Sequence, residues 1–331
     1  MSEKNTIIDI KKLVLSLLEE SLDQTEIEKK LNEIHTHFQE ITQITGYEQN
    51  IEHLAAIPAA KGKALGLNHA AQCLLDYKRT IKFLKAIVTA IKEKQREHSD
   101  EIIHIFYAGC GPYAPFVTLV TPFFKPEEIK FTLLEINKNS LQSSKSLINA
   151  LEATEYIDEL YLADAVAFKV TDPQKYHILI SETLDSLLYR ECYVPILFNL
   201  LPQFDKNVTL IPENVLINLT LLTHSLKEPN YKEHDVGSIL NVRETVVSHD
   251  NNVMPSQLSE KKIDLTSLDM ENYKNILLDT QVHIYDDIWL YRNESSLTIP
   301  FEMKLEKPSE YNSIIFTYYL EPEVELKCRF E

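Results

Sequence analysis

Two acidic side chains near the middle of the chain have the type and spacing that would hold a positively charged substrate. Glu182 and Glu191 stand nine positions apart, directly after the apolar run Tyr176–Ile180. Paired carboxylates suit a guanidinium group, because its planar fork of donors forms parallel charge-assisted hydrogen bonds with them. Positions nine apart lie on opposite faces of an α-helix of about 3.6 residues per turn, so the two acids converge only if the segment folds back as a loop. Otherwise they are two acids that flank the start of a helix.

A second group of residues has the spacing of a nucleotide-cofactor site. Gly109 and Gly111 follow the apolar run Ile102–Ala108, at a place where glycine lets the backbone approach a ligand closely. Glu135 ends the next apolar run, 24 residues after Gly111. A carboxylate at that position can accept hydrogen bonds from both hydroxyls of a ribose.

The third apolar run distinguishes between two cofactors that fit these glycines. Gly109–Ala114 satisfies the G-x-G-x-x-A form of the dinucleotide fingerprint, so a nicotinamide enzyme is an alternative. Leu160–Ala163 is followed by Asp164 and Ala165, and the carboxylate of Asp164 is suited to receive an adenine amino group, or else it caps a helix. A dinucleotide domain more often opens its chain, whereas about 100 residues precede the glycines here. These features favour a different adenosine cofactor.

Composition excludes several classes of protein. The chain has 331 residues and a formal net charge of −17, which disfavours a nucleic-acid partner because such binding relies on Lys and Arg to neutralise phosphates. Its four cysteines are far apart and form no C-x-x-C pair, so neither a metal site nor a disulfide framework is predicted. No signal peptide begins the sequence and no apolar run reaches the length of a membrane span. We therefore expect a cytoplasmic protein with no membrane partner.

The hydrophobic pattern changes twice along the chain and predicts three parts. Residues 1–66 have helical periodicity, which predicts two amphipathic helices broken near Ser21–Thr25 and then an irregular connection. Residues 67–205 begin with a helical stretch and then alternate short apolar runs with helix-like segments, which is typical of βαβ units around a parallel sheet. Residues 206–331 predict a mostly antiparallel β domain, which either closes into a barrel or forms a sandwich. The parallel strands are predicted at 102–108, 130–136, 159–163 and 177–181.

The glycine loop, the acid after the second strand and the acid after the third strand resemble the class I methyltransferases that use S-adenosylmethionine, over about residues 99–201. Three segments resemble the protein arginine methyltransferases more specifically. The fourth strand of that family ends in Ser-Glu, with a second Glu nine positions on, as at Ser181, Glu182 and Glu191. Asp76–Thr80 resembles the family's Asp-x-x-Arg-Thr helix, and Leu210–Asn214 resembles its passage into a β-barrel domain.

This resemblance implies a Rossmann-like α/β methyltransferase domain with N-terminal helices and a mostly antiparallel, barrel-like C-terminal β domain. It implies N-methylation of a guanidinium, on arginine in a protein, in a peptide or free, with S-adenosyl-L-homocysteine as the cofactor product. Glu182 and Glu191 inherit the role of a double-Glu clamp, and Arg79 inherits the grip on the cofactor carboxylate. The implied cofactor-binding residues are Arg79, Gly109, Gly111, Glu135, Asp164 and Ala165. The family dimerises through an arm in its barrel, so the resemblance is compatible with a homodimer. Thr223–Gly237 is, however, a poor candidate for the arm.

The chain also departs from the family pattern. Thr183–Asp185 stands where the family has Trp-Met-Gly, and no Thr-His-Trp element occurs in the β half. Asp185 is either a third anionic partner or the cap of the following helix. Because the missing parts help to build the protein-substrate site in the family, one alternative is an N-, O- or C-methyltransferase of a small-molecule metabolite. Another is a non-catalytic protein that binds ligands or partners through its N-terminal helices.

Overall fold

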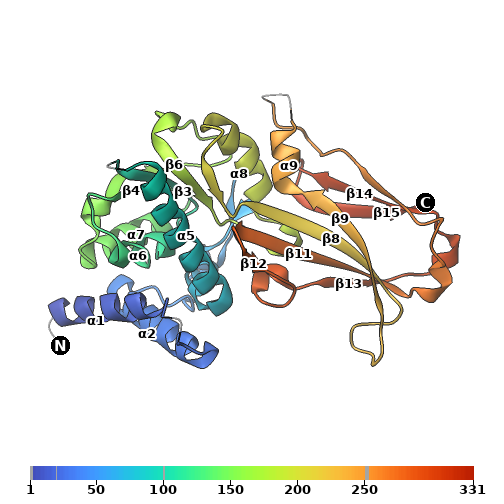
Figure 1. Cartoon of the computed structure of the whole chain (residues 1–331), viewed down its shortest axis with the longest axis horizontal. Coiled ribbons are helices and arrows are strands. Elements are labelled where there is room, and N and C mark those ends of the chain that lie inside the picture. Colours follow the sequence, from blue (N-terminus) through green and yellow to red (C-terminus); the bar gives the residue numbers. More distant parts are fainter. Residues whose placement is uncertain (1–2, 20, 100, 250–252) are drawn as a thin grey trace.

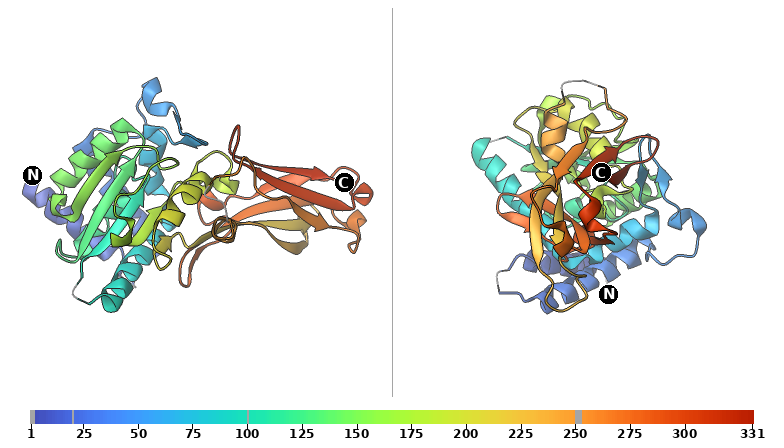
Figure 2. Two further views of the ribbon diagram at one scale, coloured as in Figure 1. Left: turned by 90° about the horizontal axis from the view of Figure 1, so that it is seen from above. Right: turned by 90° about the vertical axis from the view of Figure 1, so that its right-hand side faces the viewer.

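The molecule consists of two lobes, seen in a computed structural model that describes residues 3–19, 21–99, 101–249 and 253–331. The amino-terminal lobe contains helices and a parallel sheet, and the carboxy-terminal lobe consists mostly of antiparallel strands (Figure 1). Figure 2 shows the second lobe extending away from the first, which gives the molecule an elongated outline. None of the described helices combines the length and the apolar character that a membrane-crossing segment needs.

Five parallel strands form the sheet of the amino-terminal lobe, in the order β5-β4-β3-β6-β7. In that order they span Ile157–Leu162, Ile129–Glu135, Ile103–Ala108, Tyr176–Ser181 and Thr209–Ile211. The chain builds outward from β3 through β4 to β5, and then returns to the other side of β3 with β6 and β7. Such a reversal of strand order leaves a crevice at the carboxyl ends of the central strands, where open α/β sheets bind ligands.

The four predicted parallel strands match β3, β4, β5 and β6 to within two residues at each end. The agreement has a physical cause, because β3, β4 and β6 are almost continuous buried runs and β5 is a half-exposed edge strand. The fifth strand, β7, lies beyond residue 205 and pairs in parallel with β6. The first lobe therefore extends to Ile211.

The amino-terminal helices pack on the main body of the first lobe. Asp23 caps α2 through a capping box, in which its carboxylate accepts the N–H of Glu26 at 2.9 Å and the Glu26 carboxylate accepts the N–H of Asp23 at 3.1 Å. The predicted break near Ser21–Thr25 is therefore observed. Helix α2 buries Leu31, Ile34 and Phe38 and lies against α7. The helices of this lobe are α1 (Glu3–Ser16), α2 (Gln24–Thr42), α3 (Ile51–Leu54), α4 (Leu67–Gln72), α5 (Tyr77–Glu97), α6 (Pro115–Thr118), α7 (Lys138–Ala150) and α8 (Tyr193–Leu200).

Short elements connect these helices and strands. A small antiparallel hairpin between α3 and α4 consists of β1 (Ile57–Pro58) and β2 (Lys63–Ala64). Short 3-10 helices span Cys73–Leu75, Thr121–Phe123, Thr154–Tyr156, Pro173–Lys175, Ser186–Leu188, Leu201–Gln203, Met270–Asn272, Ser296–Thr298 and Pro308–Glu310.

Two antiparallel sheets make up the carboxy-terminal lobe, stacked one above the other in Figure 2. The larger sheet has the order β12-β11-β8-β9, and β13 also pairs with β11. Its strands are β8 (Asn214–Leu222), β9 (Glu233–Asn241), β11 (Asn275–Tyr285), β12 (Ile288–Leu290) and β13 (Phe301–Lys304), and α9 (Val242–Val247) follows β9. The smaller sheet has the order β10-β14-β15, with strands at Lys261–Asp264, Ser313–Tyr319 and Glu325–Phe330. The predicted fold class, a parallel α/β domain followed by a mostly antiparallel β domain, is confirmed.

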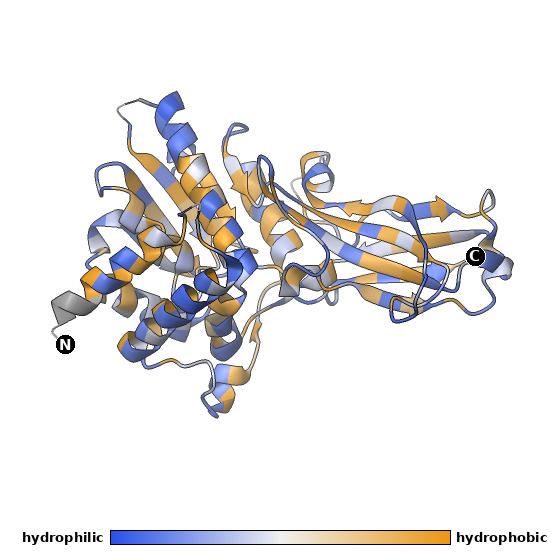
Figure 3. Ribbon diagram, turned by 60° about the horizontal axis from the view of Figure 1, so that its bottom comes forward, coloured by the Kyte–Doolittle hydropathy of each residue, from blue (hydrophilic) through white to orange (hydrophobic). Residues whose placement is uncertain are grey.

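Alternating side chains form the core of the second lobe. Along β8, Val215, Ile217 and Leu219 are fully buried, whereas Leu216 and Asn218 between them are half-exposed. Successive side chains of a strand point to opposite faces, so this pattern directs one face inward. Hydrophobic residues accordingly follow the strands of both lobes, while many connecting loops are hydrophilic (Figure 3).

A short polar contact joins the start of α5 to the second lobe. Oδ2 of Asp76 accepts hydrogen bonds from Oγ of Ser295 at 2.6 Å, from the N–H of Ser296 at 2.9 Å and from Oγ of Ser296 at 2.7 Å. Further along α5, Nζ of Lys82 donates to the carbonyl oxygen of Trp289 at 2.7 Å. The β lobe therefore fixes the first turn of α5, three residues before Arg79.

We expect Asp76→Ala to lower the free energy of unfolding by about 1.5 to 3 kcal/mol, because hydrogen bonds to a charged group contribute about that much and both serines lose their acceptor. Urea denaturation followed by the fluorescence of Trp289, the sole tryptophan, measures the change. Asp9→Ala is the matched control, since Asp9 is exposed on α1 and its loss should cost less than about 0.5 kcal/mol. Equal effects of the two substitutions would contradict the role of Asp76.

Candidate functional site

One pocket lies at the carboxyl ends of β3 and β6, where the strand order reverses. Its walls come from segments far apart in the sequence: the loops after β3, β4, β5 and β6, the hairpin β1–β2, and the residues around the start of α5. The predicted site residues that line it are Arg79, Gly109, Gly111, Glu135, Asp164, Ala165, Glu182 and Glu191. The structure therefore brings every one of the predicted residues into the same cavity.

The two glycines of the loop after β3 adopt a left-handed backbone. Gly109 has φ 76° and Gly111 has φ 65°, a region that residues with a side chain rarely occupy. A Cβ at Gly109 would collide with Cγ2 of Thr183 in the loop after β6. A Cβ at Gly111 would meet no atom within 4 Å. Gly109 thus permits close packing of the two loops, and Gly111 leaves open space in the pocket.

Glu135 fixes the glycine loop to the end of β4. Its side chain is almost fully buried, and its two oxygens accept the N–H groups of Gly111 and Asn137, each at 2.8 Å. Burial raises the pKa of this carboxyl, although the two amide donors act in the opposite direction. The carboxylate still lines the pocket.

Asp164 lies at the other wall, after β5. Oδ1 accepts the N–H of Val166 at 2.9 Å, so the side chain caps a turn and not a helix. Oδ2 accepts the N–H of Ala60 at 2.6 Å, from the hairpin between α3 and α4. The neighbouring Ala165 is buried in the pocket wall.

Arg79 and Glu182 form a buried ion pair, and each side chain is 8% exposed. Nη2 of Arg79 donates to Oε2 of Glu182. Burial raises the pKa of Glu182, whereas the positive charge of Arg79 acts against this shift. Oε1 of Glu182 is buried and has no hydrogen-bond partner among the described residues. An unpaired buried acceptor costs about 1 to 3 kcal/mol, so a ligand that donates to this oxygen would be stabilised.

The segment between the two acids folds back as a loop, which is the geometry that the clamp prediction required. Oδ2 of Asp185 accepts the N–H of Arg190 at 3.0 Å, and Oδ1 accepts the N–H of Glu191 at 3.4 Å. Leu187, with φ 59°, interrupts helical geometry. Asp185 therefore closes the loop and does not cap the following helix with its side chain. Burial, together with the charges of Asp185 and Glu182, raises the pKa of Glu191 well above its ordinary value.

Three contributors to the pocket were not predicted from the sequence. Cys73 lines the wall beside Arg79, and burial raises the pKa of its thiol to about 11. The sequence places Cys73 on the helical stretch before Arg79, but only as one of several apolar positions, so it did not indicate a pocket residue. Thr183 packs on Gly109, and the hairpin reaches Asp164. No sequence signal marks either contact, because the partners are distant in the chain.

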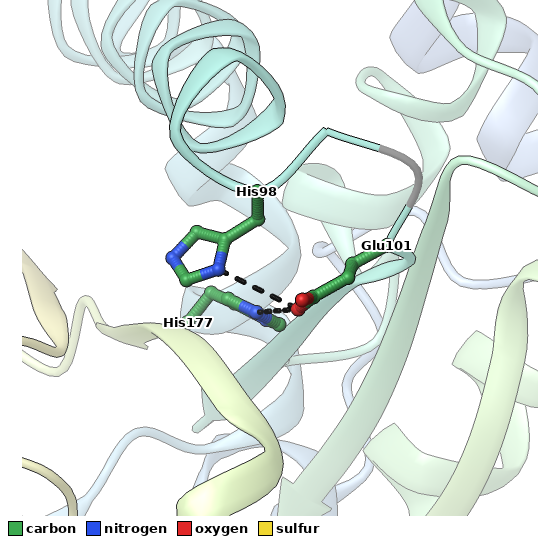
Figure 4. Close-up of side chains that lie close together, drawn as sticks. All are labelled: His98, Glu101 and His177. Atoms are coloured by element: carbon green, nitrogen blue, oxygen red, sulfur yellow. Dashed lines mark ion pairs between the residues drawn. The ribbon is translucent and has the colours of Figure 1, made fainter.

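A separate cluster of His98, Glu101 and His177 lies near the amino-terminal ends of the parallel strands (Figure 4). One possible ligand atom from each lies within 4.8 Å of the others. Nδ1 of His177 accepts the N–H of His104 at 3.1 Å, so the neutral ring carries its proton on Nε2, the atom that faces Glu101 at 3.8 Å. A metal-bound imidazole has the reverse polarity, because its second nitrogen normally donates to an acceptor. We therefore assign no metal to this cluster.

We expect Gly109→Ala to destabilise the protein by more than the roughly 1 to 2 kcal/mol that a left-handed backbone costs a residue with a side chain, because its Cβ also meets Thr183. Adding Thr183→Ser removes Cγ2, so it should recover the part of the stability loss that comes from the steric clash but not the part that comes from the backbone. Gly111→Ala is the matched control, since it should show the backbone cost alone. Free energies of unfolding in urea test all three variants, and equal losses for the two single glycine variants would contradict the packing argument.

Comparison with known proteins identifies the fold. No sequence-family model and no curated protein matches the chain. Protein arginine methyltransferase 10 of Arabidopsis thaliana, in a uniquely open conformation, is similar with a TM-score of 0.50 and 11% identity, over 80% of this chain and 97% of that chain. The PRMT1 enzyme–prozyme heterotetrameric complex of Trypanosoma brucei with AdoHcy gives a TM-score of 0.49 and 9% identity, over 78% of this chain and 92% of that chain. The chain therefore has a fold similar to that of the Arabidopsis arginine methyltransferase, and the resemblance predicted from the motifs is confirmed at the level of the fold.

Proposed function

We propose that the protein is an S-adenosylmethionine-dependent N-methyltransferase whose acceptor is a guanidinium nitrogen, of arginine in a protein, in a peptide or free. The acid pair carries this proposal. Glu182 and Glu191 enter one pocket, yet Arg79 pairs with Glu182 alone, and Arg190 faces Asp185 at 3.7 Å. Among the described residues Glu191 has no cationic partner within ion-pair distance. A cationic ligand would supply the missing charge.

The residues that line the pocket fit a sulfonium nucleoside. The space beside Gly111, the carboxylate of Glu135 and the carboxylate of Asp164 suit the nucleoside half of such a molecule. Arg79 uses one N–H for Glu182, and a guanidinium has five N–H donors, so others are available for the carboxylate of the amino-acid half. The bound cofactor would supply an electrophilic methyl group on positively charged sulfur.

Glu191 and Glu182 would bind and orient the acceptor. Arginine has a pKa of about 12.5 to 13.8 and stays protonated, so its three nitrogens share the positive charge. The Glu191 carboxylate and the unpartnered oxygen of Glu182 would hold two of these nitrogens and draw the charge toward them. The third nitrogen is then more nucleophilic, and it is held at a fixed angle, which supplies much of the rate enhancement. The guanidinium also keeps Glu191 ionised, because an ion pair offsets the cost of its burial.

Methyl transfer from radiolabelled S-adenosylmethionine to an arginine-rich peptide, to free arginine and to a phenolic metabolite tests the proposal. We expect label on the arginine substrates, and we expect Glu191→Gln to lower turnover by about a hundredfold or more through lost orientation. The affinity for S-adenosylhomocysteine, measured by calorimetry, should stay near that of the wild type. Glu191 is the better probe, because Glu182→Gln would also release Arg79.

Glu310→Gln is the control for this experiment, because it makes the same change at an exposed position of the β lobe. It should leave turnover unchanged. Label on the phenolic compound instead of arginine would favour the small-molecule methyltransferase, and full turnover by Glu191→Gln would remove the guanidinium assignment.

A second test needs no substrate. The pKa of Glu191 is raised above its ordinary value of 4.5, so the folded state binds this proton more tightly than the unfolded state does. The resulting cost is absent below about pH 4.5 and grows as the pH rises through the folded-state pKa. We therefore expect Glu191→Gln to raise the free energy of unfolding at pH 8 and to have a smaller effect at pH 4.5. A pH-independent effect, measured by urea denaturation without ligand, would contradict the raised pKa of Glu191.

A further inference from the structure

The hairpin Ile57–Ala64 contacts both ends of the pocket. At the end assigned to adenine, the N–H of Ala60 donates to Oδ2 of Asp164 at 2.6 Å. That carboxylate oxygen is the group that would receive an adenine amino group. The tip of the hairpin therefore already holds one hydrogen-bonding position on the oxygen that the nucleoside would use.

At the other end the same hairpin pairs with the loop that carries the second acid. The N–H of Lys63 donates to the carbonyl oxygen of Arg190 at 3.2 Å, and Lys63 forms a parallel bridge with Glu191. The thiol of Cys192 contacts the carbonyl oxygen of Lys63 at 3.8 Å. A displacement of the hairpin tip would thus be transmitted to the backbone at Glu191.

The hairpin is held weakly enough to move. None of the residues 57–64 is buried, and the two strands share only the pairs Ile57–Ala64 and Pro58–Lys63. Its contacts with the β lobe involve exposed or half-exposed hairpin residues: ion pairs of Lys61 with Glu321 and of Lys63 with Glu323, the latter at 3.8 Å, and the packing of Gly62 near Val324. Segments with few buried contacts open at low free-energy cost.

The size of the pocket indicates that it opens to admit a nucleoside. It encloses about 110 Å³ in the present conformation. Pockets that hold small-molecule ligands and cofactors usually span about 300 to 1,000 Å³. The hairpin is the part of the wall with the fewest buried residues, so it is the part whose displacement should cost the least free energy.

We propose that the hairpin Ile57–Ala64 is a gate that couples the two ends of the pocket. The nucleoside displaces the Ala60 N–H from Asp164, and the same movement repositions Glu191 through Lys63, so that the site for the cationic substrate is completed after the cofactor binds. The inference rests on the proposed function, because it takes a sulfonium nucleoside as the ligand at Asp164.

One substitution would lock the gate. An ideal Cβ at Gly62 lies 3.3 Å from Cβ of Cys192, close to the roughly 3.5 to 4.5 Å of disulfides, so Gly62→Cys should form a disulfide with native Cys192 when treated with oxidised glutathione. Gly62→Ser is the matched control, since it has the same φ of 75° and the same crowding by Val324 without the bond. Peptide mass analysis after alkylation verifies the crosslink.

Association of S-adenosylhomocysteine is then measured by stopped-flow fluorescence. If entry requires an open state that is populated at about 10% or less, the crosslinked Gly62→Cys protein should bind at least about tenfold more slowly than the same protein after reduction. Gly62→Ser should bind like the reduced form. Equal association rates for the crosslinked and reduced forms would overturn the gate. If the uncrosslinked wild-type protein does not bind the ligand at all, the proposed function fails as well.

Hydrogen exchange on the wild-type protein provides a test that does not depend on the folding of the variant. Adding S-adenosylhomocysteine should change the exchange of peptides that cover 57–64 and also of peptides that cover 185–192. A change confined to 57–64 would refute the coupling to Glu191, and no change in 57–64 would refute the gate.

Discussion

A shortage of positive charge around the pocket is the constraint on which the rest of the site depends. Arg79 is a buried guanidinium with Glu182 beside it, and the carboxylate of Asp185 accepts hydrogen bonds from backbone amides. Glu191 is half-buried and has no cationic partner within ion-pair distance among the described residues, and its pKa is raised. Removing a charge from water without compensation is costly, so buried acids are normally paired. Unfavourable features, such as a half-buried acid without a cationic partner, concentrate at functional sites, where the binding of a ligand can offset their free-energy cost. The proposal of a cationic ligand for this pocket rests on this imbalance.

Two features of the backbone place these charges together. The reversal of strand order at β3 puts the loops after β3 and β6 on either side of one crevice, so that Gly109 and Thr183 come into contact although 74 positions separate them. The absence of a side chain at Gly109 is what allows this approach. Arg79 reaches the same point from α5, whose first turn the β lobe holds through Asp76. The second lobe therefore contributes to the position of the buried guanidinium without supplying one of the predicted site residues.

Most of the fold could be predicted from the sequence, because parallel strands are buried apolar runs and the βαβ pattern repeats. Most of the pocket residues could be predicted for a related reason: they follow those strands, and carboxyl ends of parallel strands meet at one edge. Arg79 is the exception, because it lies on α5 and was predicted only from the motif Asp76–Thr80. The contacts of Asp164 could not be predicted, since its partner at Ala60 lies 104 residues earlier in a segment without periodicity. The contacts of Asp185 could not be predicted either, because they depend on the left-handed backbone at Leu187. A leucine in a sequence gives no indication of that conformation, which residues with a side chain rarely adopt. Contacts that depend on loop geometry, and not on hydrophobic period, are the ones that sequence reasoning misses.

The placement of the hairpin has a thermodynamic consequence for the proposed reaction. Ala60 and Lys63 belong to one short segment, so the free energy of that segment depends on what occupies Asp164 and on where Glu191 lies. Linkage is reciprocal: if a nucleoside at one end favours the position of Glu191 that binds a cation, then a cation bound there strengthens the binding of the nucleoside by the same factor. Such an arrangement favours the occupancy of both sites together over either one alone. The hairpin has no fully buried residue, and in the proposed gate this is the property that would let it respond to both ligands.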